Sequence, residues 1–135
     1  MRFFFDNNLP PRLARALHTM LGPEGFEIVC LRDRFEEGTA DEVWLPRLSS
    51  EGNWIIISGD RRILSSRHER QIWIQSGLTT FFLKSAWTRG GTRLLDMSWR
   101  LIKRWPEIVE LARTSRPGSC FLVPLKGRIE RIDIR

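Results

Sequence analysis

Three aspartates in this sequence lie where carboxylate chemistry would be expected. Asp6 directly follows the apolar run 3–5, Asp60 comes shortly after the apolar run 54–57, and Asp41 lies between them along the chain. Carboxylates that gather at one place repel one another, so such a group persists at neutral pH mainly around a divalent cation. Oxygen ligands without supporting His or Cys favour Mg²⁺ or Mn²⁺ over zinc. A bound Mg²⁺ usually keeps waters, which can attack a phosphodiester.

Strand and helix patterns alternate along the chain, and these elements must position the three aspartates. The pattern predicts strands over 3–5, 26–31, 54–57 and 79–83, and helices over 9–21, from 39 onward, 67–76 and 92–112. Residues 120–123 and 128–134 have the alternation of a short edge hairpin. Alternating strands and helices indicate an α/β fold with a mainly parallel sheet, in which ligands bind beyond the carboxyl ends of the strands.

The last predicted helix has a broad apolar stripe, which we assign to the core. Pro106 interrupts the stripe and should kink the helix. The stripe consists of Leu95, Trp99, Ile102, Trp105, Ile108, Val109 and Ala112.

The predicted sheet brings the aspartates to one edge. If the strands 3–5 and 54–57 are parallel neighbours, Asp6 and Asp60 project from the same edge. Asp41 lies four and seven residues before Leu45 and Leu48, which places it on the inward face of its helix. The first turn of that helix can reach the same carboxyl edge.

Each acidic residue also has a purely structural interpretation. Asp6, with Asn7 and Asn8, suits a turn and a helix cap before the next helix. Asp60 suits the cap of the following turn, and Glu42 suits the capping box that begins at Thr39. A metal site is favoured because Asp6 and Asp60 both follow apolar strands while an acidic residue occupies an inward helix face.

Composition limits the class of protein. The chain has 135 residues, which fits a single domain over 1–135. Two cysteines, Cys30 and Cys120, are too few and too far apart for a disulfide framework or a zinc site. A net charge of +6 favours a polyanionic partner. No apolar run approaches the roughly 20 residues that span a bilayer, so we expect no membrane association and a cytoplasmic location.

Several stretches, in a fixed order along the chain, resemble a known family. They are FFFDNNLPPRLARAL, RDRFEEGTADEVWL, IIISGDRRI with HER following it, and FFLKSAW. In these stretches the chain resembles the PIN-like domain of VapC-type toxins and, more broadly, PIN-fold nucleases. The resemblance extends from Phe3 to about Lys126. It implies a three-layer α/β/α sandwich around a mainly parallel sheet, and a Mg²⁺- or Mn²⁺-dependent ribonuclease that is often the toxin of a toxin–antitoxin pair.

The resemblance also implies roles for individual residues. Asp6 matches the acid after the first strand, Asp41 or Glu42 matches the acid of the following helix region, and Asp60 matches the acid after the third strand. Arg62 occupies a place where related sequences often have Asp. The remaining candidates for a fourth acid are Glu69 and Asp96.

Basic residues near Asp60 are the candidates for holding RNA through its phosphates. They are Arg61, Arg62, Arg67, His68 and Arg70. Asn7 or Asn8 would hydrogen-bond a bound water or the scissile phosphate. Among the six tryptophans, Trp87 in the predicted loop 85–91 is the candidate for stacking on an unpaired base. The other five lie on apolar strand or helix positions and are assigned to the core.

Two functions from different classes remain open. The first is a metal-dependent endoribonuclease with an RNA substrate and an antitoxin partner. The second is a PIN-like module that binds RNA or protein without cutting, which Arg62 in place of an acid would permit. A homodimer, through the long last helix or the edge strand 128–134, is an additional assembly that the pattern allows.

Overall fold

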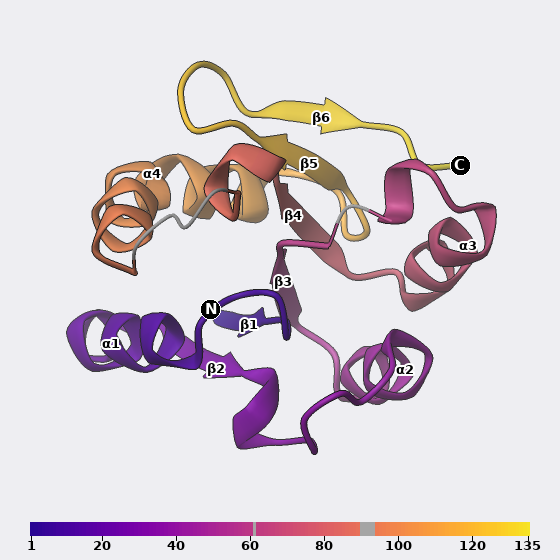
Figure 1. Ribbon diagram of the computed structural model, residues 1–135, viewed down its shortest axis with the longest axis horizontal. Coiled ribbons are helices and arrows are strands. Elements are labelled where there is room, and N and C mark those ends of the chain that lie inside the picture. The colour runs from indigo at the N-terminus through magenta and orange to yellow at the C-terminus, as the bar shows by residue number, and fades with distance from the viewer. Residues whose placement is uncertain (61, 90–93) are drawn as a thin grey trace.

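A single six-stranded sheet organises the chain (Figure 1). The computed structural model describes residues 1–60, 62–89 and 94–135. The strands are β1 (Arg2–Phe5), β2 (Glu27–Cys30), β3 (Trp54–Ser58), β4 (Thr79–Leu83), β5 (Cys120–Val123) and β6 (Glu130–Ile132). They are arranged in the order β2-β1-β3-β4-β5-β6, and every neighbouring pair is parallel except β5 with β6.

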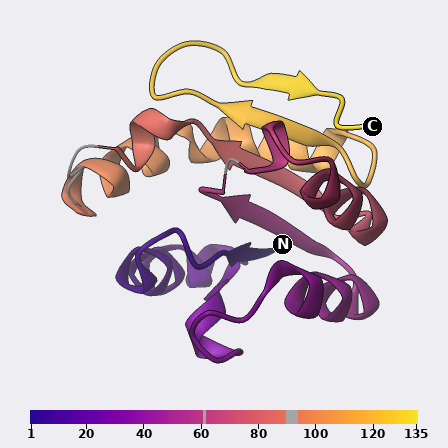
Figure 2. The same ribbon diagram turned by 45° about the vertical axis from the view of Figure 1, so that its right-hand side comes forward.

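Helices cover both faces of this sheet. They are α1 (Pro11–Leu21), α2 (Asp41–Glu51), α3 (Arg67–Ser76) and α4 (Leu94–Thr114), with short 3₁₀ turns η1 (Gly22–Glu24), η2 (Leu31–Asp33), η3 (Arg62–Leu64) and η4 (Ser85–Trp87). Figures 1 and 2 show α1 and α4 on one face and α2 and α3 on the other. The predicted three-layer α/β/α sandwich with a mainly parallel sheet is confirmed.

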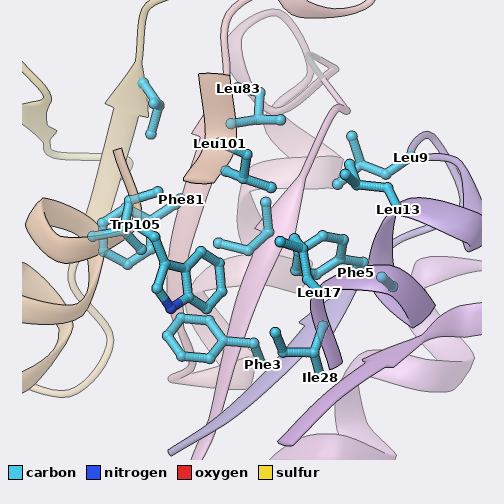
Figure 3. Close-up of a cluster of buried hydrophobic side chains, with 14 of the residues drawn as sticks. Phe3, Phe5, Leu9, Leu13, Leu17, Ile28, Phe81, Leu83, Leu101 and Trp105 are labelled. Atoms are coloured by element: carbon cyan, nitrogen blue, oxygen red, sulfur yellow. The ribbon is translucent and has the colours of Figure 1, made fainter. Parts of the chain in front are cut away.

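The central strands are buried on both faces, which explains their continuous apolar runs. Successive side chains of a strand point to opposite faces. Phe3 and Phe5 therefore pack under α1 and α4, where Leu13 lies near Phe5 and Trp105 lies against Phe3 (Figure 3). Phe4 points to the other face and packs against the α2 and α3 layer. Each fully buried Phe of this kind contributes about 1.5–3 kcal/mol to the free energy of unfolding.

The helix starts differ in part from the sequence prediction. Helix α3 begins and ends at the predicted residues, 67 and 76, with Gly77 at φ 63° closing it. Helix α2 begins at Asp41, and the predicted capping box is wrong. The N-cap is Ala40, which has no side-chain hydrogen bond to the helix, and the Thr39 hydroxyl donates to the carbonyl of Glu36 at 2.6 Å in the preceding turn.

Helix α4 buries a stripe that differs only in part from the predicted one: Trp105 and Ile108 are buried as predicted, and Val109 and Ala112 pack against the core. Its core-facing residues are Met97, Leu101, Trp105 and Ile108. Leu95, Trp99 and Ile102, which were assigned to the core, are exposed. Both sets repeat at helical spacing, and the pattern alone does not determine which one faces the sheet. The predicted start at residue 92 lies outside the described residues.

Within its described part, the chain has neither a disulfide nor a helix suited to a membrane. Cys30 and Cys120 are buried free thiols. No described helix is both long enough and apolar enough to cross a bilayer.

The strand order places a crevice beside β1 and β3. From β1 the chain passes through α1 to β2 on one side, and then through α2 to β3 on the other side. The two helices therefore lie on opposite faces, and the crevice between their connections opens at the carboxyl ends of β1 and β3. Asp6 and Asp60 follow these two ends.

Candidate metal centre

Asp6 ties the end of β1 to the end of β3. Its side chain is buried and accepts hydrogen bonds from the Ser58 hydroxyl, from the Gly59 N–H at 3.3 Å and from the Asn8 N–H at 3.1 Å. The bond from Asn8 is a local turn, as the structural interpretation predicted. The predicted helix cap is not formed, because Pro10 is the N-cap of α1. Asp6 thus holds two neighbouring loops together at the crevice.

Asp60 is engaged by Arg62 through both backbone and side chain. The Arg62 N–H donates to Asp60 Oδ1 at 2.9 Å, which forms a turn of the predicted kind. The guanidinium donates from Nε to both carboxylate oxygens at 3.1 Å and from Nη2 to Oδ2 at 2.6 Å. Asp60 is buried whereas the Arg62 side chain is 64% exposed, so this ion pair lies at the mouth of the site.

Asp41 and Glu69 approach from the first turns of α2 and α3. Both helices begin at the carboxyl edge because each follows a parallel strand of the sheet. Trp44 Nε1 donates to Asp41 Oδ1 at 3.1 Å and so orients this carboxylate. The backbone N–H of Glu69 donates to the N-cap hydroxyl of Ser66 at 3.3 Å, which fixes the first turn of α3.

Three carboxylates meet at this point. One oxygen each of Asp41, Asp60 and Glu69 lies within 4.8 Å of the other two. Arg62 Nη2 is 3.6 Å from Asp41 Oδ2, and Arg62 Nη1 is 3.7 Å from Glu69 Oε1. The Arg62 guanidinium thus contacts all three carboxylates of this group. Arg62, predicted to hold RNA, is therefore an internal counter-ion of the acidic group in this structure.

The acidic group lines a polar cavity of about 280 Å³. Asp6 lines the same cavity, although its oxygens are occupied by the hydrogen bonds described above. The cavity is lined by Asp6, Asn7, Asn8, Gly38, Thr39, Ala40, Asp41, Glu42, Asp60, Arg62, Glu69 and Ile72. The structure therefore brings the three predicted aspartates and Glu69 to one cavity.

Burial and mutual repulsion shift the pKa values of these carboxyls. Burial raises the pKa of Asp6 to about 6, and its hydrogen bonds limit the rise. Burial, followed by repulsion from Asp60 and Glu69, raises the pKa of Asp41 to about 7. Burial acts to raise the pKa of Asp60 too, but the hydrogen bonds from Arg62 outweigh it, so this pKa is lowered. Asp60 is thus the most readily ionised of these three acids.

The residues fit a hard divalent cation. Asp41 Oδ2 and Glu69 Oε2 are buried without a hydrogen-bond partner in the described part of the chain. Buried oxygens of this kind are costly unless a cation or a donor reaches them. Carboxylate oxygens are the ligands that Mg²⁺ and Mn²⁺ prefer. Such a cation would compete with the guanidinium of Arg62 for the same oxygens.

The chain matches a known protein family over its first 85 residues. The profile of a family described as PIN like domain matches residues 1–85, which is more than half of the sequence. The chain belongs to the PIN-like domain family. The match covers all the acidic residues of the cavity, and it ends before α4, β5 and β6. No curated protein and no solved structure matches this PIN-like domain significantly.

The amides and Glu42 lie at the rim of the cavity in this PIN-like domain. Asn7 and Asn8 are exposed and line it, so their side chains are accessible to a ligand. Glu42 also lines the cavity, with its side chain 63% exposed. Its Oε2 lies 3.8 Å from His68 Nε2, and it makes no capping box with Thr39.

The remaining basic candidates lie on α3, beside the acidic group. Arg67 and His68 are exposed on its first turn, and Arg70 is half-buried one turn further along. Arg61 lies outside the described residues. The described basic residues therefore remain candidates for contacting a phosphate backbone, whereas Arg62 is engaged by the acids.

Two predicted site residues lie elsewhere. Trp87 is fully buried, and its Nε1 donates to the carbonyl of Val123 at 3.0 Å. The prediction that it stacks on a base is wrong, because η4 turns the ring into the core instead of leaving it in an exposed loop. Asp96 is exposed on α4 and does not line the cavity, so Glu69 supplies the additional carboxylate.

Ser58 is a site residue that the sequence analysis did not identify. Its hydroxyl donates to Asp6 Oδ2 and accepts from the Asp60 N–H at 3.0 Å, so it connects two acids. Beside it, a Cβ at Gly59 would lie 3.1 Å from the Asn8 Cβ, which shows how closely the two loops approach. The sequence contained one sign of this role: Ser58 and Gly59, a small polar residue and a glycine, stand between an apolar run and Asp60.

Replacing Ser58 with alanine should lower the free energy of unfolding by about 1–3 kcal/mol, because a buried Asp6 oxygen loses its donor. The pKa of Asp6 should rise above its present value, since the Ser58 hydrogen bond lowers it. Chemical denaturation and NMR titration would measure the two effects. Ser50→Ala, which removes an exposed hydroxyl on α2, is the matched control. Equal stability of the Ser58 and Ser50 variants would contradict the prediction.

Proposed function

We propose that this PIN-like domain is a metal-dependent endoribonuclease and the toxin of a toxin–antitoxin pair of the VapC type. PIN-like domains are generally nucleases, which supports the reaction class. The observation that carries the proposal is the group of Asp41, Asp60 and Glu69 at the crevice beside β1 and β3. Two buried oxygens of this group accept no hydrogen bond from any described residue.

The acidic residues would hold Mg²⁺ or Mn²⁺. When bound, this ion would supply an activated water and stabilise negative charge on the phosphate oxygens. Asp41, Asp60 and Glu69 would be the direct ligands. Asp6 would position the site by holding the β1 and β3 loops, and it becomes a further ligand if one of its hydrogen bonds is released.

The rim of the cavity would hold the RNA. Asn7 and Asn8, which line the cavity, would donate hydrogen bonds to the scissile phosphate or to an adjoining water. Arg67, His68 and Arg70 would contact the flanking phosphates, in keeping with the net charge of +6. Such contacts would supply affinity and register without selecting a base sequence.

Arg62 would have two positions in this proposal. In the metal-free protein it neutralises Asp41, Asp60 and Glu69. With a divalent ion bound, the long exposed side chain would turn outward and become available to a phosphate. Metal binding and RNA binding would then be coupled through one arginine.

An antitoxin would provide regulation in the cell. Among the described strands β6 pairs only with β5, so its other edge would offer a surface to which an extended peptide can add. A small adjacent gene encoding a DNA-binding protein would support this part of the proposal, and cell growth restored by its co-expression would test it.

A second function is a module that binds RNA or protein without cutting. Arg62 favours it, because a built-in cation already pairs with the acids. Calorimetry with Mn²⁺ distinguishes the two functions. If the wild-type chain does not bind Mn²⁺, the proposal that it is a nuclease is contradicted. A phosphotransfer reaction with Asp6 as nucleophile is disfavoured, because position 8 is Asn instead of a second Asp.

The decisive assay is cleavage of labelled structured RNAs by the full chain. We expect internal cuts with Mg²⁺ or Mn²⁺, and none after the metal is chelated. Asp60→Asn, which retains the shape of the side chain, should be inactive in the same preparation. Equal cleavage by wild type and Asp60→Asn would assign the activity to a contaminant and would contradict the proposal.

A further inference from the structure

A second cavity, of about 310 Å³, adjoins the acidic one. Asp60 lines both cavities, so they meet at this residue. The second cavity lies at the carboxyl ends of β4 and β5, the strands that follow β3 in the sheet (Figure 1). Its volume falls at the lower end of the range for small-molecule sites, about 300–1,000 Å³. We call it the β4 pocket.

The floor of the β4 pocket is apolar. It consists of Ile63, Phe82 and Leu122, of which the first two are buried and the third is partly buried. The acidic cavity, by contrast, presents carboxylates. A metal ion or a phosphate would lose its hydration on such a floor without gaining ligands, whereas an apolar ring is stabilised there. The floor therefore suits the face of an aromatic ring.

Two cations line the rest of the β4 pocket. Lys84 follows the last residue of β4, and Arg89 lies just beyond η4. Arg89 Nη2 donates to Ser85 Oγ at 3.2 Å, which holds this guanidinium against η4. No carboxylate in the described part of the chain forms an ion pair with Lys84, so its ammonium has donors for a ligand. Since Asp60 is engaged by Arg62, the pocket offers mainly donors, and its ligand must bring acceptors.

The charge of the chain is unevenly distributed along the sequence. Residues 86–135 contain 11 basic and 5 acidic residues, whereas residues 1–85 contain 11 basic and 11 acidic residues. The net charge of +6 therefore comes from the part that follows the family match and that includes β5 and β6. Because β5 adjoins β4, a polyanion at the metal centre would be drawn across the β4 pocket toward this part.

From these observations we propose that the β4 pocket is the subsite for one unpaired base of the RNA, and that it prefers guanine. The subsite rests on the proposed function, because a phosphate held beside Asp60 leaves the attached nucleoside next to the pocket. The base would lie against the apolar floor, in the way that unpaired bases stack on side chains of RNA-binding proteins. A base within a helix would not enter, since its faces are already stacked.

The cations of the β4 pocket select the base. Guanine carries two acceptors, O6 and N7, on one edge, and their contact with Arg or Lys is the commonest specific contact to a base. Adenine carries an amino group in place of O6, so a donor of the pocket would face a donor of the base. Lys84 should contribute most to the preference, because it has no ion-pair partner among the described residues.

Binding of short RNAs, measured by fluorescence anisotropy with all metal chelated, tests the subsite without cleavage. The probes are short labelled oligouridines that carry one central guanosine, adenosine or inosine. We expect the guanosine and inosine probes to bind the wild-type chain at least about fivefold more tightly than the adenosine probe, because inosine retains O6 and N7. Equal binding of the three probes, or binding of none, would overturn the inference.

Variants of Lys84 test the residue that carries the preference. Lys84→Gln should reduce the preference for guanosine to within about a factor of two, and Lys84→Arg, which keeps a donor cation, should retain most of it. Lys103→Gln is the matched control, because it removes the same charge from an exposed position on α4 that does not line the pocket. It should weaken all probes alike and leave the preference unchanged. A preference that survives in Lys84→Gln would overturn the inference.

The cleavage assay separates the subsite from the proposed nuclease. A chain that prefers guanosine but cuts no RNA would contradict the nuclease and support the subsite in an RNA-binding module. A chain that cuts RNA with metal but binds the three probes equally would support the nuclease and overturn the subsite. Near-ultraviolet circular dichroism would verify that each variant is folded.

Discussion

Replacing Asp41 with asparagine should decrease the RNA cleavage rate about a hundredfold or more, while making the metal-free protein more stable at about pH 8. The activity falls because the variant loses a carboxylate that would bind the metal. The stability rises because the substitution removes a buried negative charge next to Asp60 and Glu69. Asparagine keeps the oxygen that accepts from Trp44 Nε1, so the local packing is preserved.

The gain in stability should depend on pH in a definite direction. The pKa of Asp41 is about 7 in the folded chain and near 3.8 when unfolded, so folding favours its protonated form. The resulting destabilisation is absent below about pH 4, grows as the pH rises and is complete above about pH 7. The free energy of unfolding of Asp41→Asn should therefore exceed that of the wild type by about 2 kcal/mol more at pH 8 than at pH 4.

Denaturation across this pH range, without metal, would measure the difference. Asp33→Asn is the matched control, because the hydrogen bond from Arg15 lowers the pKa of Asp33. This control should lose stability above pH 4 relative to the wild type, the opposite direction. An Asp41 variant that loses both activity and stability at pH 8 would indicate a structural role and would contradict the prediction.

Replacing Arg62 with glutamine should strengthen Mn²⁺ binding at least about tenfold. The guanidinium contacts Asp41, Asp60 and Glu69, and its positive charge repels an incoming cation. Its removal leaves the acidic group with uncompensated negative charge. The metal-free variant should therefore have a lower thermal midpoint at about pH 8, and saturating Mn²⁺ should restore it.

Calorimetric titration with Mn²⁺ would measure this affinity. Arg67→Gln removes the same charge from the exposed first turn of α3, where Arg67 makes no ion pair with the described residues. It should leave the affinity within about a factor of two of the wild type, because exposed charges are screened. Weaker Mn²⁺ binding by Arg62→Gln than by Arg67→Gln would show that Arg62 supports the metal site and does not compete with the ion.

Part of the candidate site could be predicted from the sequence, because the local pattern of apolar residues determines where these acids lie. The runs 3–5 and 54–57 are apolar on both sides, and only the centre of a parallel sheet buries both faces of a strand. Asp6 and Asp60 therefore had to lie at the carboxyl edge. Asp41 followed from its spacing to Leu45 and Leu48, since helical periodicity places these residues on one side.

The residues that were assigned wrongly depend on contacts between segments distant in sequence. Trp87 is buried because its ring reaches the carbonyl of Val123, 36 residues further along the chain. Trp99 is exposed because the sheet meets α4 through Met97 and Leu101 instead. The capping box is a local error of another kind, because α2 has Ala40 as its N-cap and so begins one residue too late for Thr39 to cap it.

The sequence by itself determined which layer architecture this chain adopts and which sheet edge carries its acids, because strand and helix periods are local properties. Only the tertiary structure decided which further carboxylate joins these acids and which cation pairs with them. Glu69 joins Asp41 and Asp60 because α2 and α3 begin side by side at the crevice. Arg62 pairs with these acids, because its own N–H is held by Asp60 Oδ1 and its guanidinium therefore lies beside Asp60 and within reach of Asp41 and Glu69.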